Sequence, residues 1–171
     1  MTLSLDELAR FVAALAAEPE RWQHLVRHAS DARVYEQIWD DERVNAWVIC
    51  WSEDQDTGFH DHDESGAAIA VISGQVREER LRLGAPTARQ VVGPGSTITI
   101  PSVAIHRVLH AGGTPAVTIH AYSPPLMRTG VYRVAAGGEL ERRSLSVEEE
   151  LRAEQELALA GLGDDALAGG I

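Results

Sequence analysis

The chain has 171 residues, enough for one domain with a sizeable core, and carries 26 acidic against 15 basic residues, a net charge of −11 at pH 7. This charge argues against nucleic acid as a partner, because phosphate binding needs a basic surface. Every basic residue is an arginine, which excludes lysine Schiff bases and a P-loop. The sequence has neither a run of 18 apolar residues nor a basic N-terminal start, so we expect no membrane span, no signal peptide and a cytoplasmic protein.

Helical patterns occupy the N-terminal segment, residues 1–31. Ser4 and Glu7 match a capping box, and the apolar residues that follow recur at helical spacing. They predict a helix over residues 5–17. Pro19 then opens a second helical stretch, and together these elements form a helical cap.

From residue 32 to residue 134 the pattern changes to strands. Short runs rich in Val, Ile, Thr and Trp are separated by Gly, Pro and Asp clusters at roughly ten-residue intervals, which is typical of all-β barrels. The single cysteine, Cys50, lies in one of these runs and is predicted to be a small buried hydrophobe. The predicted strands are residues 44–51, 67–73, 75–83, 89–92, 96–100, 106–110, 117–122 and 131–134.

The last segment, residues 135–171, is acidic. Ser146 and Glu149 repeat the capping-box pattern and predict a helix from residue 146 to about residue 160. We expect this helix to dock on the barrel, with an acidic interaction tail as the alternative. The three segments together are interpreted as one domain.

Three histidines form the candidate metal site. His60 and His62 stand two apart with strand signals on both sides, and residues i and i+2 of a strand share a face. Both imidazoles can therefore reach one ion. His106, in a second apolar run, can supply a third nitrogen from a neighbouring strand. The alternative is that these are ordinary surface or core histidines.

The spacing of these residues resembles the two motifs of the cupin barrels. The second cupin motif runs glycine, five residues, proline, four residues, histidine, and Gly95, Pro101 and His106 match it. A typical cupin also has a glutamate ligand four or five residues after the second histidine, where this chain has Gly66 and Ala67. The resemblance implies an all-β cupin (double-stranded β-helix, jelly-roll) barrel with a metal held by three neutral histidines. Such a site keeps the full charge of the ion and favours an anionic, chelating substrate.

A row of polar side chains follows near the end of the barrel. Thr118, His120 and Tyr122 lie at i, i+2 and i+4 of an apolar strand, so hydroxyl, imidazole and phenol line one face. We interpret them as a hydrogen-bonded relay, in which His120 orients the phenol and Thr118 fixes the imidazole tautomer. The alternative is a buried polar ladder that only satisfies its own hydrogen bonds.

Together the motifs resemble the cysteine dioxygenases and related thiol dioxygenases, over roughly residues 34–133. This resemblance implies an iron(II) cofactor bound by the three histidines, the polar row as catalytic residues, and a cis form of the Ser123-Pro124 bond. The matching residues are Trp51, His60-Asp61-His62 with Ser65, His106-Arg107-Val108, and Thr118, His120, Tyr122, Ser123, Pro124 and Pro125.

Two features depart from that family. Some animal members carry a cysteine five residues after the second histidine that becomes linked to the tyrosine, but position 67 is alanine here, so no such crosslink can form. Members that act on cysteine hold the substrate carboxylate with an upstream arginine, and an ungapped alignment puts Val34 there, with Arg33 one residue away. A one-residue offset flips a side chain to the other face of a strand. Arg33 is still the candidate clamp because it lies nearest to the aligned position, although this offset would turn its side chain to the opposite face. The alternative clamps are Arg77, Arg107 and Arg128.

The sequence thus predicts a non-haem iron(II) dioxygenase that converts a small thiol acid and O2 to a sulfinic acid, with no nucleic-acid or membrane partner. L-cysteine is the favoured substrate, and 3-mercaptopropionate or another mercapto acid is the alternative. Two other classes stay open: a zinc- or other metal-dependent cupin hydrolase or isomerase, and a non-enzymatic cupin that binds a small ligand. The polar row argues against both. The sequence leaves the oligomeric state open.

Overall fold

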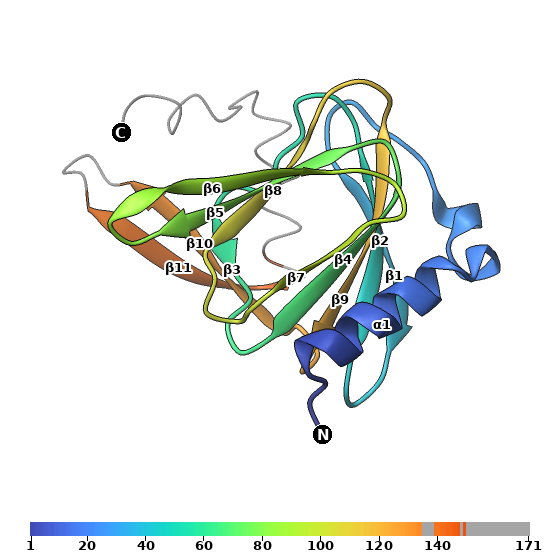
Figure 1. Cartoon of the computed structure of the whole chain (residues 1–171), viewed down its shortest axis with the longest axis horizontal. Helices are drawn as coiled ribbons and strands as arrows, with labels where there is room; N and C mark the ends of the chain where they lie inside the picture. Colours follow the sequence, from blue (N-terminus) through green and yellow to red (C-terminus); the bar gives the residue numbers. More distant parts are fainter. Residues whose placement is uncertain (135–138, 148, 150–171) are drawn as a thin grey trace.

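The computed structural model describes residues 1–134, 139–147 and 149, and within them two β-sheets face each other with an α-helix on the outside (Figure 1). One sheet has the strand order β1-β2-β9-β4-β7 and the other β11-β10-β3-β8-β5-β6, and all pairings are antiparallel. This confirms the all-β prediction. The strands are β1 (Val34–Asp40), β2 (Asn45–Trp51), β3 (His60–Asp61), β4 (Gly66–Ser73), β5 (Val76–Arg82), β6 (Ala85–Val92), β7 (Thr97–Ile100), β8 (His106–His110), β9 (Ala116–Ser123), β10 (Arg128–Val134) and β11 (Leu140–Ser146).

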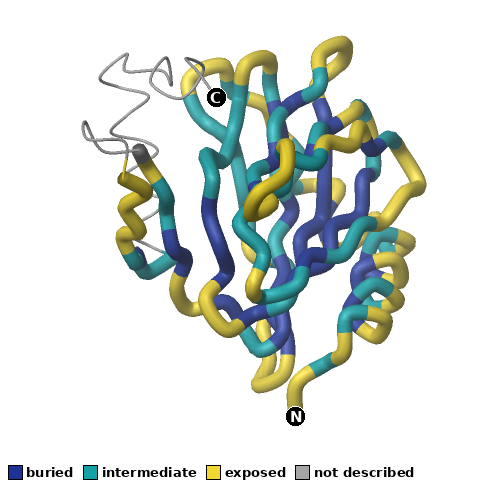
Figure 2. The backbone as a smooth tube through the Cα atoms, turned by 60° about the vertical axis from the view of Figure 1, so that its left-hand side comes forward, coloured by how far each residue is buried: buried dark blue, intermediate teal, exposed yellow. Residues whose placement is uncertain are grey.

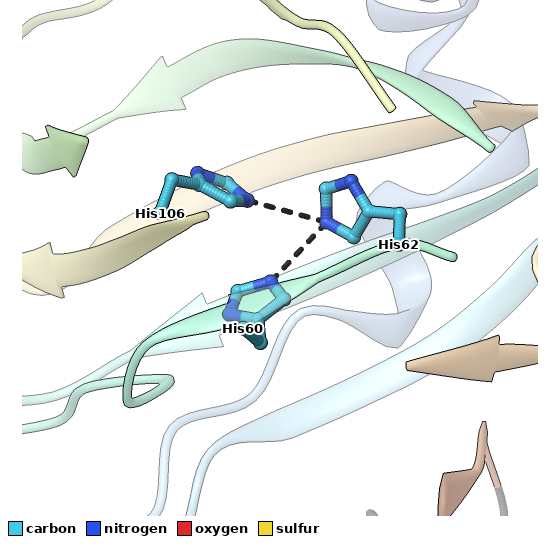
Figure 3. Close-up of side chains that lie close together, drawn as sticks. All are labelled: His60, His62 and His106. Atoms are coloured by element: carbon cyan, nitrogen blue, oxygen red, sulfur yellow. Dashed lines mark hydrogen bonds between the residues drawn. The ribbon is translucent and has the colours of Figure 1, made fainter. Parts of the chain in front are cut away.

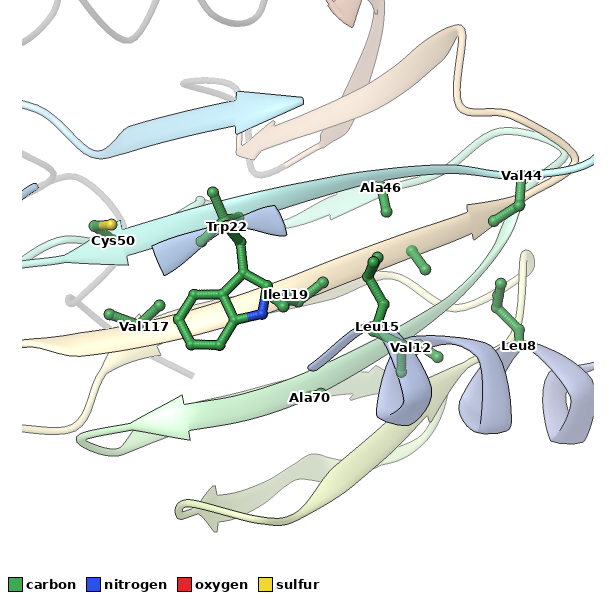
Figure 4. Close-up of a cluster of buried hydrophobic side chains, with 13 residues drawn as sticks. Leu8, Val12, Leu15, Trp22, Val44, Ala46, Cys50, Ala70, Val117 and Ile119 are labelled. Carbon is green, nitrogen blue, oxygen red and sulfur yellow. The ribbon is translucent and has the colours of Figure 1, made fainter. Parts of the chain in front are cut away.

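Helix α1 (Leu5–Ala16) covers the outer face of the five-stranded sheet. Ser4 caps it as predicted, since its hydroxyl accepts from the Glu7 N–H and the Glu7 carboxylate accepts from the Ser4 N–H. The apolar side of the helix packs on β4 and β9 (Figure 4). It brings Leu8, Val12 and Leu15, all buried, into one hydrophobic cluster with strand residues.

The prediction of a second helix that begins at Pro19 is wrong. Two short 3₁₀ turns, Pro19–Arg21 and Gln23–Leu25, take its place. Between them Trp22 has φ −132°, outside the helical range, and its side chain lies in the cluster beneath α1. Packing of this indole against the sheet therefore interrupts the helical backbone.

Strand alternation divides the five-stranded sheet into two differently packed faces. On β2, Ala46, Val48 and Cys50 face the helix, whereas Trp47, Ile49 and Trp51 pack in a second cluster between the sheets. The chain is most deeply buried along these central strands (Figure 2). Burial also raises the pKa of the Cys50 thiol, which agrees with the predicted structural role.

All eight predicted strands are present, with ends that differ by up to four residues. Three strands were not predicted: β1, the two-residue β3, and β11. Strand β11 lies in the segment that the sequence assigned to a helix and tail, so the sheet continues beyond residue 134. The Ser146 and Glu149 capping bonds are present, and the rest of the predicted C-terminal helix lies outside the described residues.

In the part of the chain that the structure describes, no helix is both long and apolar enough to cross a membrane.

Candidate metal centre

The three predicted ligands meet between the sheets (Figure 3). His60 on β3 lies directly opposite His106 on β8, and His62 follows two residues later with its ring on the same side. The side chains are 6, 2 and 1 % exposed for His60, His62 and His106. The Nε2 atom of His62 lies 3.2 Å from Nε2 of His60 and 3.2 Å from Nε2 of His106. No carboxylate joins this group among the described residues.

The protonation of these imidazoles suits metal binding. Nδ1 of His60 lies 3.0 Å from the Gly58 carbonyl and donates to it, which leaves the Nε2 lone pair directed at the other rings. Burial, reinforced by the neighbouring histidines, holds the pKa values of His62 and His106 well below their usual range. The rings of His62 and His106 are therefore neutral at physiological pH.

The spacing also fits a single ion. Imidazole nitrogens bind a divalent metal at about 2.0–2.1 Å, so the nitrogens around one ion stand roughly 3 to 3.4 Å apart. The two measured separations of 3.2 Å fall in this range. Hydrogen bonds alone cannot satisfy three converging nitrogens whose lone pairs face each other, whereas a cation satisfies all of them.

Two buried carboxylates, Glu78 and Asp61, lie next to the candidate ligands. Glu78 on β5 is buried, with Oε1 3.7 Å from Nδ1 of His106, and is held by Arg80 and Gln90. This separation is too long for a hydrogen bond, and Nδ1 of His106 has no hydrogen-bond partner among the described residues. The sequence signal was the alternation of β5, which places Glu78 on the same sheet face as Arg80, the cross-strand partner of His106.

Asp61 lies between the first two ligands but points to the opposite face. Arg142 on β11 donates to both of its oxygens, at 2.7 and 2.8 Å, and the Tyr132 hydroxyl donates at 2.6 Å. Burial raises the pKa of Asp61, but these hydrogen bonds outweigh it and the net pKa lies well below the usual range. Gly130, opposite Asp61 on β10, leaves room for the guanidinium, which a Cβ there would overlap.

The polar row on β9 forms the expected hydrogen bonds. Thr118 Oγ1 lies 3.0 Å from Nε2 of His120, and Nδ1 of His120 lies 3.3 Å from the Tyr122 hydroxyl. Burial, with a contribution from the positive charge of Arg33, lowers the pKa of His120 to about 3. The Tyr122 ring packs edge-on against the candidate ligand His62, at 4.9 Å between centroids. The row therefore leads from the interior of the sheet to the metal centre.

One further residue joins this row. The indole nitrogen of Trp51 donates to Thr118 Oγ1 at 2.8 Å. The sequence showed Trp51 only as a match to a family position, and the cross-strand contact between β2 and β9 reveals its partner.

A cavity beside the centre is lined by side chains from both sheets. Arg33 is among them, and its guanidinium lies 5.2 Å above the Trp51 ring. Ala67 is the cross-strand neighbour of Tyr122, so the position where relatives carry the crosslinking cysteine adjoins the phenol. The lining residues are Arg33, Tyr35, Trp47, Ile49, Thr57, His60, His62, His120, Tyr122, Leu126, Thr129 and Val147.

The three arginines that were alternative carboxylate clamps form contacts away from this cavity. Arg77 pairs with Glu79, and Arg107 pairs with Glu79 and Asp56. Arg128 donates to Ser144 on β11. None of the three lines the cavity.

Strand β1 explains how Arg33 reaches the cavity although Val34 occupies the aligned position. The β1–β2 register changes from Val34 opposite Cys50 to Trp39 opposite Ala46, so a bulge adds one residue to β1. Upstream of this bulge Val34 packs in the cluster beneath α1. Its neighbour Arg33 therefore points to the other face of the sheet, toward the histidines.

Comparison with known proteins agrees with this arrangement. A family model described as cysteine dioxygenase type I matches residues 2–134. Cysteine dioxygenase type 1 of Danio rerio is 26% identical over 137 residues, 72% of this chain and 67% of that protein. The Homo sapiens protein of the same name is 23% identical over 135 residues, 72% of this chain and 66% of that protein. The chain thus spans about two thirds of the length of these relatives.

Solved structures support the fold. A cupin superfamily protein from Desulfitobacterium hafniense DCB-2 is similar with a TM-score of 0.52 at 9% identity, over 60% of this chain and 87% of that chain. The expected cupin jelly roll is therefore confirmed. Because the family model extends from the N-terminal helix to the end of β10, the chain belongs to the cysteine dioxygenase type I family.

Proposed function

We propose that this protein is an iron(II)-dependent thiol dioxygenase, which converts a small thiol acid and O2 to the corresponding sulfinic acid. One observation carries the proposal: His60 and His62, the guanidinium of Arg33 and the phenol of Tyr122 line the same cavity. The metal site would bind the thiolate of the substrate, and Arg33 would bind its carboxylate. Tyr122 would donate a hydrogen bond to dioxygen in the same cavity.

The metal centre suits iron(II). Three neutral imidazoles leave the double positive charge of the ion intact and favour an anionic substrate. Iron(II), when bound, supplies the redox chemistry that joins both atoms of O2 to the thiolate sulfur. The protein contributes the orientation of His60, because the Gly58 carbonyl accepts a hydrogen bond from its Nδ1.

The lining of the cavity also suits a carboxylate. Among the described residues that line the cavity, Arg33 is the one arginine, and none is an aspartate or glutamate. A guanidinium binds a carboxylate with two parallel hydrogen bonds, and stacking on Trp51 limits its motion. Arg33 is therefore the proposed carboxylate clamp.

Tyr122 is the proposed donor to dioxygen. His120 holds its hydroxyl from one side, and the ring packs on His62, which brings the phenol beside the metal ligands. The apolar side chains of Trp47, Ile49 and Leu126 line the same cavity and limit the access of water. A proton held at this oxygen would meet the charge that develops on O2 as sulfur is oxidised.

L-cysteine is the favoured substrate, because the curated relatives are named cysteine dioxygenases. The alternative, 3-mercaptopropionate, has the same thiol and carboxylate without the amine. The test is metal analysis of the purified protein followed by oxygen uptake and product analysis with both thiols and with cysteamine, which lacks a carboxylate. We expect stoichiometric iron, a sulfinate from at least one thiol acid, and turnover of cysteamine at least 100-fold slower. A zinc-loaded protein that consumes no oxygen with any of the three would refute the proposal.

Replacing Arg33 tests whether this arginine binds the substrate carboxylate. Arg33→Met should raise KM for the thiol acid about 10- to 100-fold, since a charged hydrogen bond is worth roughly 1.5–3 kcal/mol. Arg128→Met is the matched control, because Arg128 is exposed and bonds only to Ser144 among the contacts described here. Equal KM values for the two variants would show that Arg33 does not hold the substrate.

A further inference from the structure

We infer that the hydrogen bonds of the polar row run in one direction, from Trp51 through Thr118 and His120 to Tyr122. Trp51, the first donor of this row, is a positioning residue. In this arrangement His120 is the Nδ1–H tautomer, and the hydroxyl hydrogen of Tyr122 is not donated to His120. The direction follows from geometry alone; its catalytic consequence rests on the proposed function.

The first step is the indole of Trp51. An indole N–H can only donate, and it lies 2.8 Å from Thr118 Oγ1. Both residues are fully buried, so water does not compete for this bond. Thr118 Oγ1 therefore acts as an acceptor toward Trp51.

The second step is the single hydrogen of the Thr118 hydroxyl. Among its described contacts, the oxygen has one other polar neighbour, Nε2 of His120 at 3.0 Å. If Nε2 carried a proton, two donors would converge on Oγ1 and the hydroxyl hydrogen would be buried without an acceptor. A buried donor left without an acceptor costs about 1–3 kcal/mol. The hydroxyl therefore donates, and Nε2 of His120 carries the lone pair.

The third step is the imidazole of His120. The ring is buried and its pKa is lowered to about 3, so it is neutral at physiological pH. A neutral ring with a bare Nε2 carries its hydrogen on Nδ1. That hydrogen meets the Tyr122 oxygen, 3.3 Å away, and the phenol accepts. Because the phenol is the acceptor in this bond, its own hydrogen is not donated to His120.

Trp51 thereby contacts both parts of the site. Its edge donates to the polar row, and its face lies beneath the guanidinium of Arg33, the proposed carboxylate clamp. Its ring also stacks on His120, with 6.1 Å between centroids. The Trp51 side chain thus orients both Arg33, which would hold the substrate carboxylate, and the polar row that ends at the Tyr122 hydroxyl.

The tautomer can be measured without turnover. The full chain is labelled with ¹⁵N-histidine, and two-bond ¹H–¹⁵N spectra are recorded metal-free and with zinc, whose filled d shell keeps the spectra diamagnetic. We expect Nδ1 of His120 to be protonated and Nε2 to be unprotonated but hydrogen-bonded. A protonated Nε2, or a ring protonated on both nitrogens at pH 7, would overturn the inference. The expected tautomer together with a protein that oxidises no thiol would instead refute only the proposed function.

Variants test each donor in turn. Thr118→Val removes the donor to Nε2 and should yield a mixture of His120 tautomers, whereas Thr118→Ser keeps the hydroxyl and should retain the wild-type tautomer. Trp51→Phe should lower kcat about five- to tenfold with KM changed less than about twofold, the effect expected for one hydrogen bond. Trp22→Phe is the matched control, because this buried indole lies in the cluster beneath α1. A kcat for Trp51→Phe equal to that of Trp22→Phe would show that Trp51 does not position the row.

Discussion

At the residue scale, the metal centre depends on three nitrogens that come from two segments of the chain. His60 and His62 share a strand face, and His106 lies opposite His60 on β8. Each ring is buried, and among the described residues no carboxylate belongs to this group that could replace a lost nitrogen. Removal of one ring therefore leaves a weak two-ligand site.

Replacing any one of these histidines by alanine should reduce iron affinity at least about 100-fold and abolish oxygen uptake, more than the effect of losing an outer hydrogen-bond partner of a ligand. Iron content after purification and equilibrium dialysis would measure this. His110→Gln is the control, because this buried histidine bonds to the Thr114 carbonyl and takes no part in the three-histidine group. Stoichiometric iron in His106→Ala would refute the ligand assignment.

Tyr122→Phe removes one hydroxyl and leaves the ligands in place. If the hydroxyl donates to dioxygen, kcat should fall about 10²- to 10³-fold, as for other positioned donors to a developing anion. Iron content and thiol binding should remain at wild-type values. His120→Ala should cause a smaller loss, because it releases the phenol without removing it. Wild-type rates with an unchanged ratio of oxygen consumed to sulfinate formed would argue against the role of Tyr122.

At the scale of secondary-structure elements, the strand β3 has only two residues, of which His60 is one candidate ligand, and His62 follows directly after it. Strand β8 pairs with it on one side and β10 on the other. Arg142 on β11 adds a side-chain contact across this sheet, since it binds both oxygens of Asp61 from the face opposite the metal site. The β10–β11 hairpin thus holds the ligand strand in position.

This contact makes stability depend on pH. The lowered pKa of Asp61 means that its ion pair stabilises the fold above the unfolded-state pKa of about 4, and that this contribution is lost as the pH falls below that value. Arg142→Met should lower the free energy of unfolding by about 2 kcal/mol at pH 7, and the difference from wild type should shrink toward pH 3. Urea unfolding across this pH range would measure it.

Arg133→Met is the matched control on the same hairpin. Arg133 pairs with Glu141 in an exposed ion pair, which is worth about 0–1 kcal/mol. If Arg142→Met were no more destabilising than Arg133→Met, the contact with Asp61 would have no structural role.

At the scale of the whole molecule, the metal joins strands that are distant in sequence. The ligands on and beside β3 and on β8 are more than 40 residues apart, and Tyr122, a member of the hydrophobic cluster between the sheets, packs against His62. A ligand that binds only the folded state stabilises it according to its concentration and affinity.

Removal of the metal should therefore lower the melting temperature. At a metal concentration 100 times Kd the stabilisation is about 2.7 kcal/mol, or roughly 5 to 10 °C for a domain of this size. Differential scanning calorimetry with iron(II) under anaerobic conditions, and after chelation, would measure the shift. His106→Ala should show no shift on addition of iron. A shift of equal size in that variant would locate the stabilising metal elsewhere.

Local periodicity was sufficient for much of the site. His60 with His62, and Thr118 with His120 and Tyr122, share faces because side chains alternate along any strand, and this holds whichever strands lie beside them. The capping box at Ser4 is equally local, and the helix it predicts is present. The sequence by itself thus determined the all-β class, the shared side of His60 and His62, and the order of the polar row.

Tertiary structure decided which residues complete the site. The bulge in β1 directs Arg33 rather than Val34 toward the cavity, and cross-strand contacts join Trp51 to Thr118 and Arg142 to Asp61. The packing of Trp22 likewise replaced a predicted helix by 3₁₀ turns. Each outcome depends on the register between strands or on contacts between distant segments, and these arise only when the whole chain folds, since the backbone of a single strand carries no information about its partner.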